Sequence, residues 1–284
     1  MNRLIFNTFK RGSKTYFYSS IFFSKEIRDD VFALYSFVRK ADNFVDVLPQ
    51  QKDEFHRFKD AYNNALEGKA GSDIIIDSFV ELMQRKSFQS EWVDAFFESM
   101  EMDLTKGRYE ALEETLHYVY GSAEVIGLMM AKIMDLDPQS YPFARHLGRA
   151  MQYINFIRDI EEDLALGRTY LPLGGSGLER LDRDYVMGRQ DVFCAFIRDH
   201  IGLYRRWQQE AERGFAYIPR RCLIPIRTAS DMYQWTAERI NRDPLIVFQR
   251  KVKPAIPRIV VQIVANSLLS AEGLSSKRGV RPYV

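Results

Sequence analysis

The sequence predicts an all-α protein that forms one domain over residues 1–284. Apolar residues recur at three- and four-residue steps through most of the chain, which is the spacing of amphipathic helices, and candidate strands are nearly absent. The breaks between these periodic segments are short and turn-like, and no long Ser- or Gly-rich linker divides the chain. We therefore expect a single helical domain.

The predicted helices follow one another with little intervening sequence. In the first of them, residues 25–48, the apolar side chains of Val31, Leu34, Val38 and Ala41 fall on one face. The same period predicts helices over residues 52–66, 73–86, 90–102, 111–134, 142–166, 190–216, 222–241 and 253–271. The separating segments carry turn residues: PQQ around Pro49, KAGS around Gly71, DPQSYP around Pro138 and Pro142, and PLGGSG after Tyr170.

The composition is that of a soluble globular protein, with 46% hydrophobic and 27% charged residues among 284. Lysine and arginine exceed aspartate and glutamate by only two, so the net charge indicates no nucleic-acid partner. Cys194 and Cys222 stand alone, which suits the reducing cytoplasm. We find neither a signal peptide nor a bilayer-spanning apolar run, and we expect a protein in solution or on a membrane surface. No feature of the sequence specifies an oligomeric state.

Two segments, RKADNFVDV and QYINFIRDIEEDLALGRTYLP, each carry a pair of aspartates at four-residue spacing. The pairs are Asp42 with Asp46 and Asp159 with Asp163, and on a helix each pair points to one side. Either pair alone is typical of a solvated acidic face. Because apolar residues surround both pairs and the motif occurs twice, the pattern favours two helices that turn their carboxylates towards a cavity.

Amide side chains continue the second acidic stripe, since Gln152 and Asn155 precede Asp159 on the same side of the predicted helix. Hard oxygen ligands without histidine or cysteine favour Mg²⁺, with Mn²⁺ as the alternative metal, and such ions are commonly shared with substrate phosphates. A di-iron bundle would need two Glu-x-x-His pairs, and the sequence offers only Glu114 with His117. Two facing acidic helices therefore predict magnesium ions that hold a phosphate or diphosphate.

Five blocks, in chain order, resemble the squalene and phytoene synthase family of head-to-head prenyl synthases. They are GSKTYFYSS at 12–20, FVRKADNFVD at 37–46, MEMDLTKGRYE at 100–110, YVYGSAEVIGLM at 118–129, and the second acidic segment. The resemblance covers nearly the whole chain. It implies the all-α isoprenoid synthase fold, a helical bundle around a central cavity.

The resemblance also implies roles for individual residues. Asp42, Asp46, Asp159 and Asp163, with Asn155 beside them, match the magnesium-diphosphate motifs, and Arg39 and Arg158 match the motif arginines. Ser13, Thr15 and Tyr16 match a segment that supplies a hydroxyl and an aromatic ring near the diphosphate. Tyr118 matches a tyrosine that points into the reaction centre, Tyr233 falls in the cavity, and Arg250 and Arg258 fall at a diphosphate.

The activity implied by the resemblance is a magnesium-dependent prenyltransferase whose substrates are prenyl diphosphates. The leading interpretation is a phytoene synthase that joins two geranylgeranyl diphosphates and needs no NADPH. One alternative is a dehydrosqualene or squalene synthase that uses farnesyl diphosphate, and another is a catalytically silent homologue that acts in assembly or at a membrane surface. Two departures from the family pattern, Asn43 in place of a second aspartate and Glu124 in place of glycine, keep the silent alternative open.

Further expectations concern the walls of the cavity and the N-terminus. The aromatic residues expected to stabilise carbocations are Tyr16, Phe17, Phe22, Tyr118, Tyr120 and Tyr233. Ala123 and Gly127 share one face of their predicted helix, where small side chains serve either a long prenyl tail or close helix packing. Basic residues Arg3, Lys10 and Arg11 among Leu4, Ile5, Phe6 and Phe9 predict either peripheral membrane contact or a segment that caps the cavity.

Overall fold

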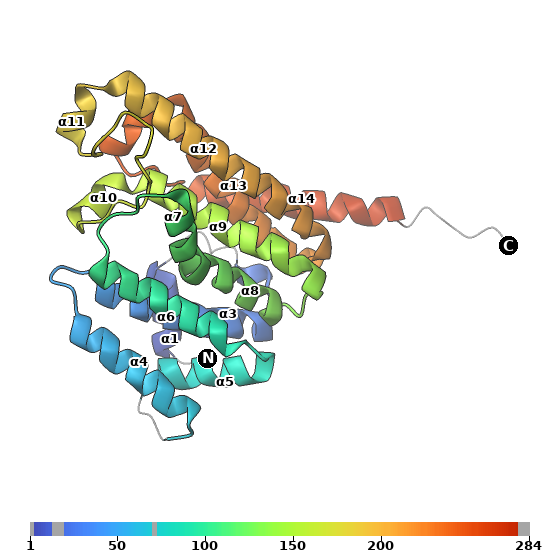
Figure 1. Ribbon diagram of the computed structural model, residues 1–284. Helices are drawn as coiled ribbons and strands as arrows, with labels where there is room; N and C mark the ends of the chain where they lie inside the picture. Colours follow the sequence, from blue (N-terminus) through green and yellow to red (C-terminus); the bar gives the residue numbers. More distant parts are fainter. Residues whose placement is uncertain (1–2, 13–19, 70–72, 278–284) are drawn as a thin grey trace.

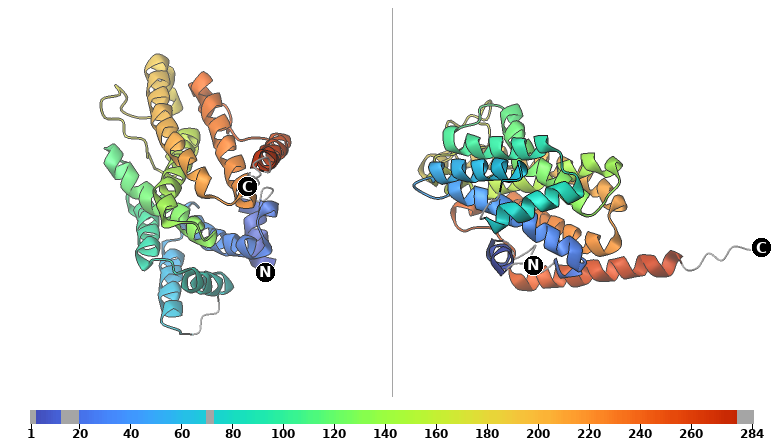
Figure 2. Two further views of the ribbon diagram at one scale, coloured as in Figure 1. Left: turned by 90° about the vertical axis from the view of Figure 1, so that its right-hand side faces the viewer. Right: turned by 90° about the horizontal axis from the view of Figure 1, so that it is seen from below.

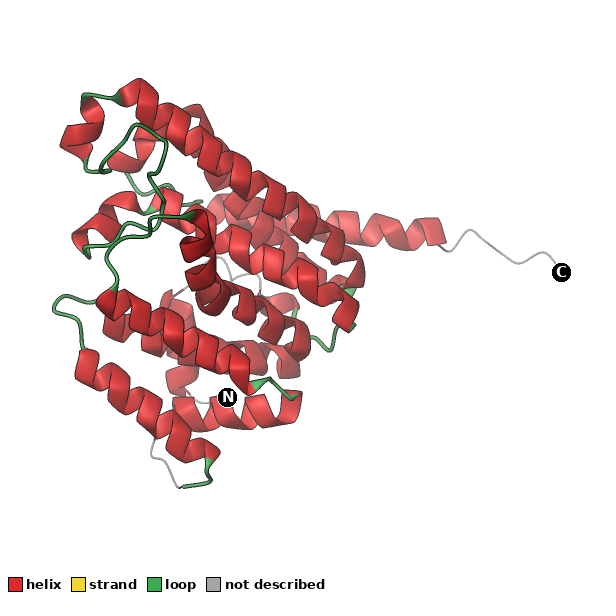
Figure 3. Cartoon of the chain, viewed as in Figure 1, coloured by secondary structure: helices red, strands yellow, loops and turns green. Residues whose placement is uncertain are grey.

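The computed structural model describes residues 3–12, 20–69 and 73–277, and helices make up most of this part of the chain (Figure 1 and Figure 3). No strand occurs within these ranges, and only one isolated parallel bridge joins Arg108 to Thr169. The predicted all-α class is confirmed. Ser13, Thr15, Tyr16 and Phe17, which the sequence placed near the diphosphate and the carbocation, lie outside the described residues.

The helical elements follow in chain order. They are α1 (Arg3–Gly12), η1 (Ser20–Phe22), α3 (Lys25–Val45), α4 (Lys52–Leu66), α5 (Ile74–Lys86), α6 (Ser90–Thr105), α7 (Leu112–Val119), η2 (Tyr120–Glu124), α8 (Val125–Ile133), η3 (Pro138–Ser140), α9 (Tyr141–Arg158), α10 (Ile160–Ala165), α11 (Arg183–Met187), α12 (Gln190–Arg213), η4 (Gly214–Tyr217), α13 (Arg220–Arg242), η5 (Pro244–Phe248) and α14 (Ile256–Lys277). Every helix expected from periodicity is present, and the short helices α1 and α11 were not expected.

Local capping explains several of the helix starts. The Ser24 side chain accepts a hydrogen bond from the Ile27 N–H at 3.3 Å and begins α3. Asp73 caps α5 and Asp182 caps α11 in the same way. Each cap satisfies a backbone donor that the first turn of a helix leaves without a partner.

One hydrophobic core is built mainly from α1, α3, α4, α5, α6 and α8. At its centre the Phe37 ring stacks on Phe79 with ring centroids 3.8 Å apart. The N-terminal helix belongs to this core, because Ile5 and Phe9 are buried and Phe9 stacks on Phe32 at 4.1 Å. Much of the apolar surface predicted for the N-terminus is therefore covered by the protein itself.

A second core is built from α7, α9, α10, α12, α13 and η5. Helix α12 packs along α9, and the buried Tyr153 hydroxyl of α9 lies 2.5 Å from His200 Nδ1 of α12. Burial lowers the pKa of His200 to about 4. The ring is therefore neutral near pH 7, and Nδ1 accepts the hydrogen bond from the tyrosine.

A π-helical turn, η2, joins α7 to α8 and packs tightly against both α6 and α9. A Cβ on Gly121 would lie 1.9 Å from the Ala95 carbonyl oxygen, and one on Gly148 would lie 2.4 Å from the Ala123 carbonyl oxygen. Glycine is needed at these two positions because the neighbouring backbones approach so closely. The sequence predicted a regular helix here, and periodicity cannot detect the extra residue of a π turn.

The first and last helices lie on the same side of the molecule. Figure 2 shows α1 and α14 along one edge in both views, and α14 extends past the body of the protein. Helix α14 packs on α13, which also contacts η1. Within the described ranges, none of the helices combines the length and the hydropathy that a bilayer-spanning segment requires.

Candidate active site

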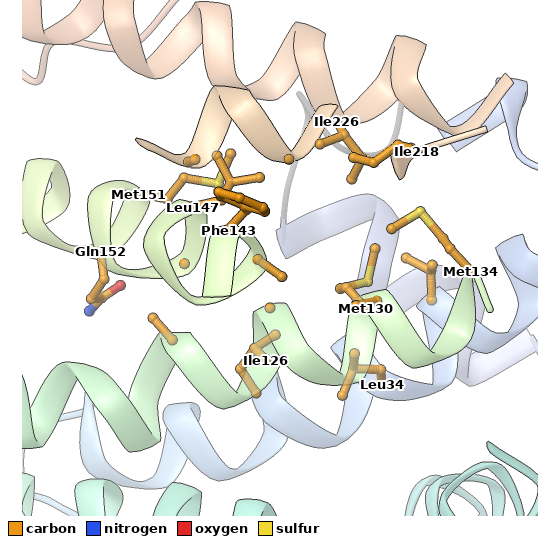
Figure 4. Close-up of a pocket in the computed structure, with 18 of the residues that line it drawn as sticks. Leu34, Ile126, Met130, Met134, Phe143, Leu147, Met151, Gln152, Ile218 and Ile226 are labelled. Atoms are coloured by element: carbon orange, nitrogen blue, oxygen red, sulfur yellow. The ribbon is translucent and has the colours of Figure 1, made fainter. Parts of the chain in front are cut away.

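A long apolar cavity lies beside the first core. Its lining comes mainly from α3, η2, α8, α9 and α13, with further residues from α1 and η4, and Figure 4 shows Gln152 at one end and Met134, Ile218 and Ile226 at the other. The space between the atoms is about 1360 Å³ with the open mouth included. Gln152, Asn155 and Tyr233 give this cavity one polar end, and the rest of its wall is almost wholly apolar.

The first aspartate motif lies at the end of α3, just beyond the polar end of the cavity. Val38 lines the cavity, and Asp42 follows it by one helical turn. Arg39 Nη1 donates to Asp42 Oδ2 at 3.1 Å. Burial, with the nearby Asp46 carboxylate as a second cause, raises the pKa of Asp42 to about 7 despite this arginine. The positive charge of Arg39 is therefore not enough to offset the effect of burial on the Asp42 carboxylate.

Arg168, which the sequence analysis did not single out, holds the second aspartate of this motif. The buried guanidinium donates from Nη1 to Asp46 Oδ1 at 2.8 Å and from Nη2 to the Val45 carbonyl oxygen at 2.6 Å. Its Nε lies 3.6 Å from Asp103 Oδ1. The Asp103 carboxylate also accepts hydrogen bonds from the Tyr118 hydroxyl at 2.7 Å and from the Tyr170 hydroxyl at 2.5 Å.

The second aspartate motif lies where α9 meets α10. Backbone hydrogen bonds from Asp159 N to Asn155 O and from Asp163 N to Asp159 O continue through the junction, so the predicted stripe survives the break. The Arg158 guanidinium donates two hydrogen bonds to the Asp159 carboxylate, one of them from Nε to Oδ1 at 2.8 Å. Burial alone would raise the pKa of Asp159, but Arg158 and Lys251 hold it below its usual range.

Asp163 is the carboxylate of the site with the fewest contacts to positive charge or hydrogen-bond donors. Among the described residues, none gives its side chain a hydrogen bond or an ion pair. Burial raises its pKa to about 8, and the carboxylates of Asp159, Asp103 and Asp46 add to the shift. Because Asp46 belongs to the other motif, the two motifs lie close enough for their carboxylates to interact. Arg168 links them through its backbone N–H, which donates to the Asp163 carbonyl oxygen at 2.8 Å.

The donor set suits a hard divalent cation. Among the described residues the buried Asn155 Oδ1 has no hydrogen-bond partner, and burial, with neighbouring carboxylates as a second cause, raises the pKa of both Asp42 and Asp163. Within the described residues, no three His, Cys, Asp or Glu side chains lie close enough together to hold a metal by themselves. This arrangement fits Mg²⁺, which binds through few carboxylates and completes its shell with water and phosphate oxygens.

Cationic side chains gather beside the second motif. Lys251 lies 3.3 Å from Asp159 Oδ1 and also pairs with Glu162. Burial together with the nearby Arg158 and Lys251 lowers the pKa of Lys253. The family resemblance places Arg250 and Arg258 at a diphosphate as well. Within the described part of the chain neither pairs with an acidic side chain, and the Arg258 guanidinium lies 5.0 Å from the centre of the Trp235 ring.

Some of the residues predicted for the cavity line it in the structure, and others do not. Gln152, Asn155, Tyr233, Ala123 and Gly127 line the cavity, and Gly127 also lets α8 approach the Ala144 carbonyl of α9. Tyr118 does not line it, because its ring packs against Tyr109, Phe156 and Tyr170 behind the first motif. Tyr120 lies beneath the Arg145 guanidinium, and Phe22 is also absent from the lining. The lining aromatics not predicted are Phe9, Phe23, Tyr35, Phe143 and Phe215.

Neither of the two departures from the family pattern, Glu124 and Asn43, is among the residues that line the cavity. Glu124 is buried and accepts from Arg145 Nε at 2.8 Å and from Arg149 Nε at 2.6 Å, so it ties η2 to α9. Asn43 is exposed, next to Asp42 in sequence. Neither side chain intrudes between the two motifs and the apolar cavity.

An all-α bundle with two aspartate motifs at the polar end of an apolar cavity has the fold of the isoprenoid synthases. Within that class, the chain belongs to the squalene/phytoene synthase family, whose sequence model matches residues 9–258.

Curated relatives and solved structures agree with this assignment. The chain is 28% identical to a chloroplastic phytoene synthase of an Oncidium hybrid cultivar over 84% of its length, and it spans 61% of that protein. It is 27% identical to phytoene synthase 2 of Solanum lycopersicum, with 93% of this chain and 89% of that protein covered. A ligand-bound dehydrosqualene synthase superposes with a TM-score of 0.82 at 20% identity, covering 94% of this chain and 96% of the other.

Proposed function

We propose that this protein is a magnesium-dependent prenyltransferase that joins two geranylgeranyl diphosphates head to head to form phytoene, a reaction of carotenoid biosynthesis. The observation that carries the proposal is that Arg168 joins two aspartate motifs beside the polar end of a long apolar cavity. The acidic end suits a metal-bound diphosphate, and the apolar length suits a prenyl chain. Relatives that are named phytoene synthases support the choice of product.

The residues proposed to hold Mg²⁺ are Asp42, Asp46, Asn155, Asp159 and Asp163, and Mn²⁺ is the alternative ion. When bound, the metal would neutralise the diphosphate and assist its departure as a Lewis acid. Around this centre the guanidinium groups of Arg39 and Arg158 can take diphosphate oxygens in charge-assisted hydrogen bonds. Lys251 and Lys253 add positive charge on the side of the second motif.

The reaction proposed here balances without a protein nucleophile or a reductant. The first substrate loses diphosphate, the allylic cation is attacked by the double bond of the second, and a proton leaves to give a cyclopropylcarbinyl diphosphate. This intermediate then loses its own diphosphate, rearranges and loses a second proton to give phytoene. The products are one hydrocarbon, two diphosphates and two protons, so NADPH is not required.

The cavity wall would protect the carbocations during these steps. Apolar side chains from both cores exclude water, which would otherwise capture the cation. The rings of Tyr35 and Tyr233 line the cavity near its polar end, and an aromatic face stabilises a nearby cation by roughly 0.5–2 kcal/mol. Tyr35 stays un-ionised, because burial raises its pKa to about 12.

Product analysis tests the proposal. The purified protein is given Mg²⁺ with geranylgeranyl diphosphate or farnesyl diphosphate, with and without NADPH, and extracts are analysed by mass spectrometry. We expect phytoene from geranylgeranyl diphosphate without NADPH, and no product after chelation of the metal. In Asp163→Asn we expect a loss of about 100-fold or more in rate. Asp60→Asn, a change at an exposed residue of α4, is the matched control and should keep the wild-type rate.

Two other outcomes would reject the proposal in different ways. A thirty-carbon product formed only from farnesyl diphosphate would assign the protein to the dehydrosqualene or squalene branch. Folded protein that releases no diphosphate from either substrate would identify a catalytically silent family member.

A further inference from the structure

The outward side of α14 is apolar. Ile256, Val260, Val261, Val264 and Leu268 are exposed, and the exposed fractions reach 68% at Val261 and 61% at Leu268. Their spacing puts them on one side of the helix. Such a run of exposed aliphatic side chains is unusual on a protein surface that faces only water.

The inward side of the same helix is held partly by polar contacts. Gln262 Nε2 and Asn266 Nδ2 donate to Asp231 Oδ2 of α13 at 2.7 Å and 2.8 Å, and Asn266 also donates to Thr228 Oγ1 at 3.2 Å. Ile259 is buried beside them. An ordinary surface helix turns polar groups outward and apolar groups inward, whereas α14 fixes its amides to the protein and exposes its valines.

This apolar surface lies directly outside the cavity wall. Helix α14 rests on α13, and the exposed Ile21 belongs to η1, which also contacts α13. The inner sides of the same region contribute Phe23, Ile226 and Tyr233 to the cavity. The two views of Figure 2 place α1 on this side as well. The apolar face and the lipid-sized cavity are therefore separated by a single layer of helices.

The chain segments that carry α1, η1 and the start of α14 are basic in sequence. The segments 1–24 and 249–271 contain no aspartate or glutamate, although the chain as a whole has 38 of these residues. Their charged residues are all basic: Arg3, Lys10, Arg11, Lys14, Arg250, Lys251, Lys253 and Arg258. The chain as a whole has a net charge of only +2, so positive charge is concentrated in these two segments.

We propose that the outward side of α14, together with Ile21 and the exposed side chains of Arg3, Arg250 and Arg258, docks on the surface of an anionic lipid bilayer. Aliphatic side chains on one side of a helix enter the headgroup region, and lysine and arginine at the flanks are attracted to anionic lipids. A second copy of this chain fits less well, since a symmetric contact would bring the same basic flanks together. The choice of a lipid surface also rests on the proposed function, whose substrates and product are lipids.

Sedimentation with lipid vesicles tests the docking surface without substrate or turnover. The full chain is mixed with vesicles of phosphatidylcholine alone or of phosphatidylcholine with phosphatidylglycerol. We expect binding to the phosphatidylglycerol vesicles, weaker binding at high salt, and a loss of about tenfold or more in affinity for Val261→Ser/Val264→Ser. The matched control, Met187→Ser/Val192→Ser, changes exposed apolar residues at α11 and α12 and should bind like the wild type.

The outcomes separate this proposal from the proposed function. Unchanged binding in Val261→Ser/Val264→Ser, or no binding by the wild type, would overturn the docking surface even if phytoene is formed. A dimer seen by light scattering without lipid, and lost in the same variant, would assign the face to a second copy. The variant should keep the wild-type rate on detergent-dispersed substrate, so a protein that binds vesicles but makes no hydrocarbon contradicts only the proposed function.

Discussion

Arg168 is the residue on which the arrangement of the buried acids depends most. One guanidinium contacts the carboxylate of Asp46, the Val45 carbonyl and the buried Asp103, and only 3% of its surface is exposed. Arginine can do this because its planar fork carries five donors, whereas lysine offers a point charge on a flexible chain. Loss of this one side chain would leave Asp103 buried without a cation.

We expect Arg168→Gln to lower the free energy of unfolding by about 3–5 kcal/mol, the usual cost of removing one partner of a buried ion pair. The measurement is urea denaturation followed by circular dichroism. Arg108→Gln is the control, since Arg108 makes an exposed pair with Glu110 and should cost no more than about 1 kcal/mol. The double variant Asp103→Asn/Arg168→Gln should recover part of the loss, and no recovery would show that the charge of Asp103 is not the cause.

His200 predicts a pH-dependent contribution to stability. Its pKa is about 4 in the folded protein and near 6.5 in an unfolded chain, so the unfolded state binds the proton more readily. The stabilisation is complete above pH 6.5 and is lost as the pH falls from 6.5 towards 4. Relative to pH 7.5, the wild type should lose about 2 kcal/mol at pH 5 from this residue.

The variant His200→Gln isolates that contribution, because a glutamine oxygen can still accept from the Tyr153 hydroxyl but does not titrate. Urea midpoints at pH 7.5 and pH 5 should fall further in the wild type than in the variant. Equal falls in the two proteins would mean that His200 has the same pKa in the folded and unfolded states.

The residues that the sequence could identify were those whose neighbours are local. Asp42 with Asp46 and Asp159 with Asp163 are visible because four-residue spacing on a helix is enough to align them. Arg168 was missed because its partner Asp46 lies 122 positions away and only the fold brings them together. Lys251 was missed for the same reason, since its partner Glu162 is 89 positions away.

At the scale of the helices, close backbone contacts give the cavity its shape. Gly148 on α9 faces the Ala123 carbonyl of η2, where a Cβ would lie 2.4 Å from the oxygen. Gly148→Ala should therefore push α9 and η2 apart and cost about 1–3 kcal/mol in stability. Gly202→Ala on α12 is the control with the opposite sign. Nothing lies within 4 Å of its added Cβ, so a gain of about 0.5–1 kcal/mol is expected.

Chemical denaturation of the two glycine variants measures both effects. A stability of Gly148→Ala equal to or above that of the wild type would show that the two helices can separate at no cost. The control measures the general stabilisation that alanine gives a helix relative to glycine, so that this effect can be separated from the clash at Gly148.

Helix positions were predictable, but their irregularities were not. The predicted helix 52–66 matches α4 at both ends, because a strong apolar period is interrupted by turn residues on each side. The predicted helix 111–134 contains the π turn η2, and the predicted helix 142–166 breaks at Asp159. An apolar period locates a helix but does not record a π turn or a one-residue break within it.

At the scale of the whole molecule, the two aspartate motifs come from different cores. Helix α3 belongs to the first core, and α9 and α10 belong to the second. A ligand held by both motifs should therefore stabilise the folded protein as a unit. We expect Mg²⁺ with inorganic pyrophosphate to raise the melting temperature more than either does alone. At 100 times the dissociation constant, the free energy of unfolding should rise by about 2.7 kcal/mol.

Differential scanning calorimetry measures this stabilisation, and a chelator should remove it. Asp163→Asn should lose most of the effect, and the control Asp60→Asn should keep it. Stabilisation by pyrophosphate alone that equals the combined effect would argue against a shared metal site.

The apolar cavity also has a meaning for packing. Protein interiors are normally packed as densely as organic crystals, whereas this fold builds a cavity lined with leucine, isoleucine, methionine and phenylalanine side chains. In the proposed reaction a hydrocarbon chain occupies the place that side chains would occupy in another helical protein. Substrate and product would therefore contribute to the packing of the interior while they are bound. Each turnover would then break and re-form the apolar contacts between the bound hydrocarbon and the cavity wall.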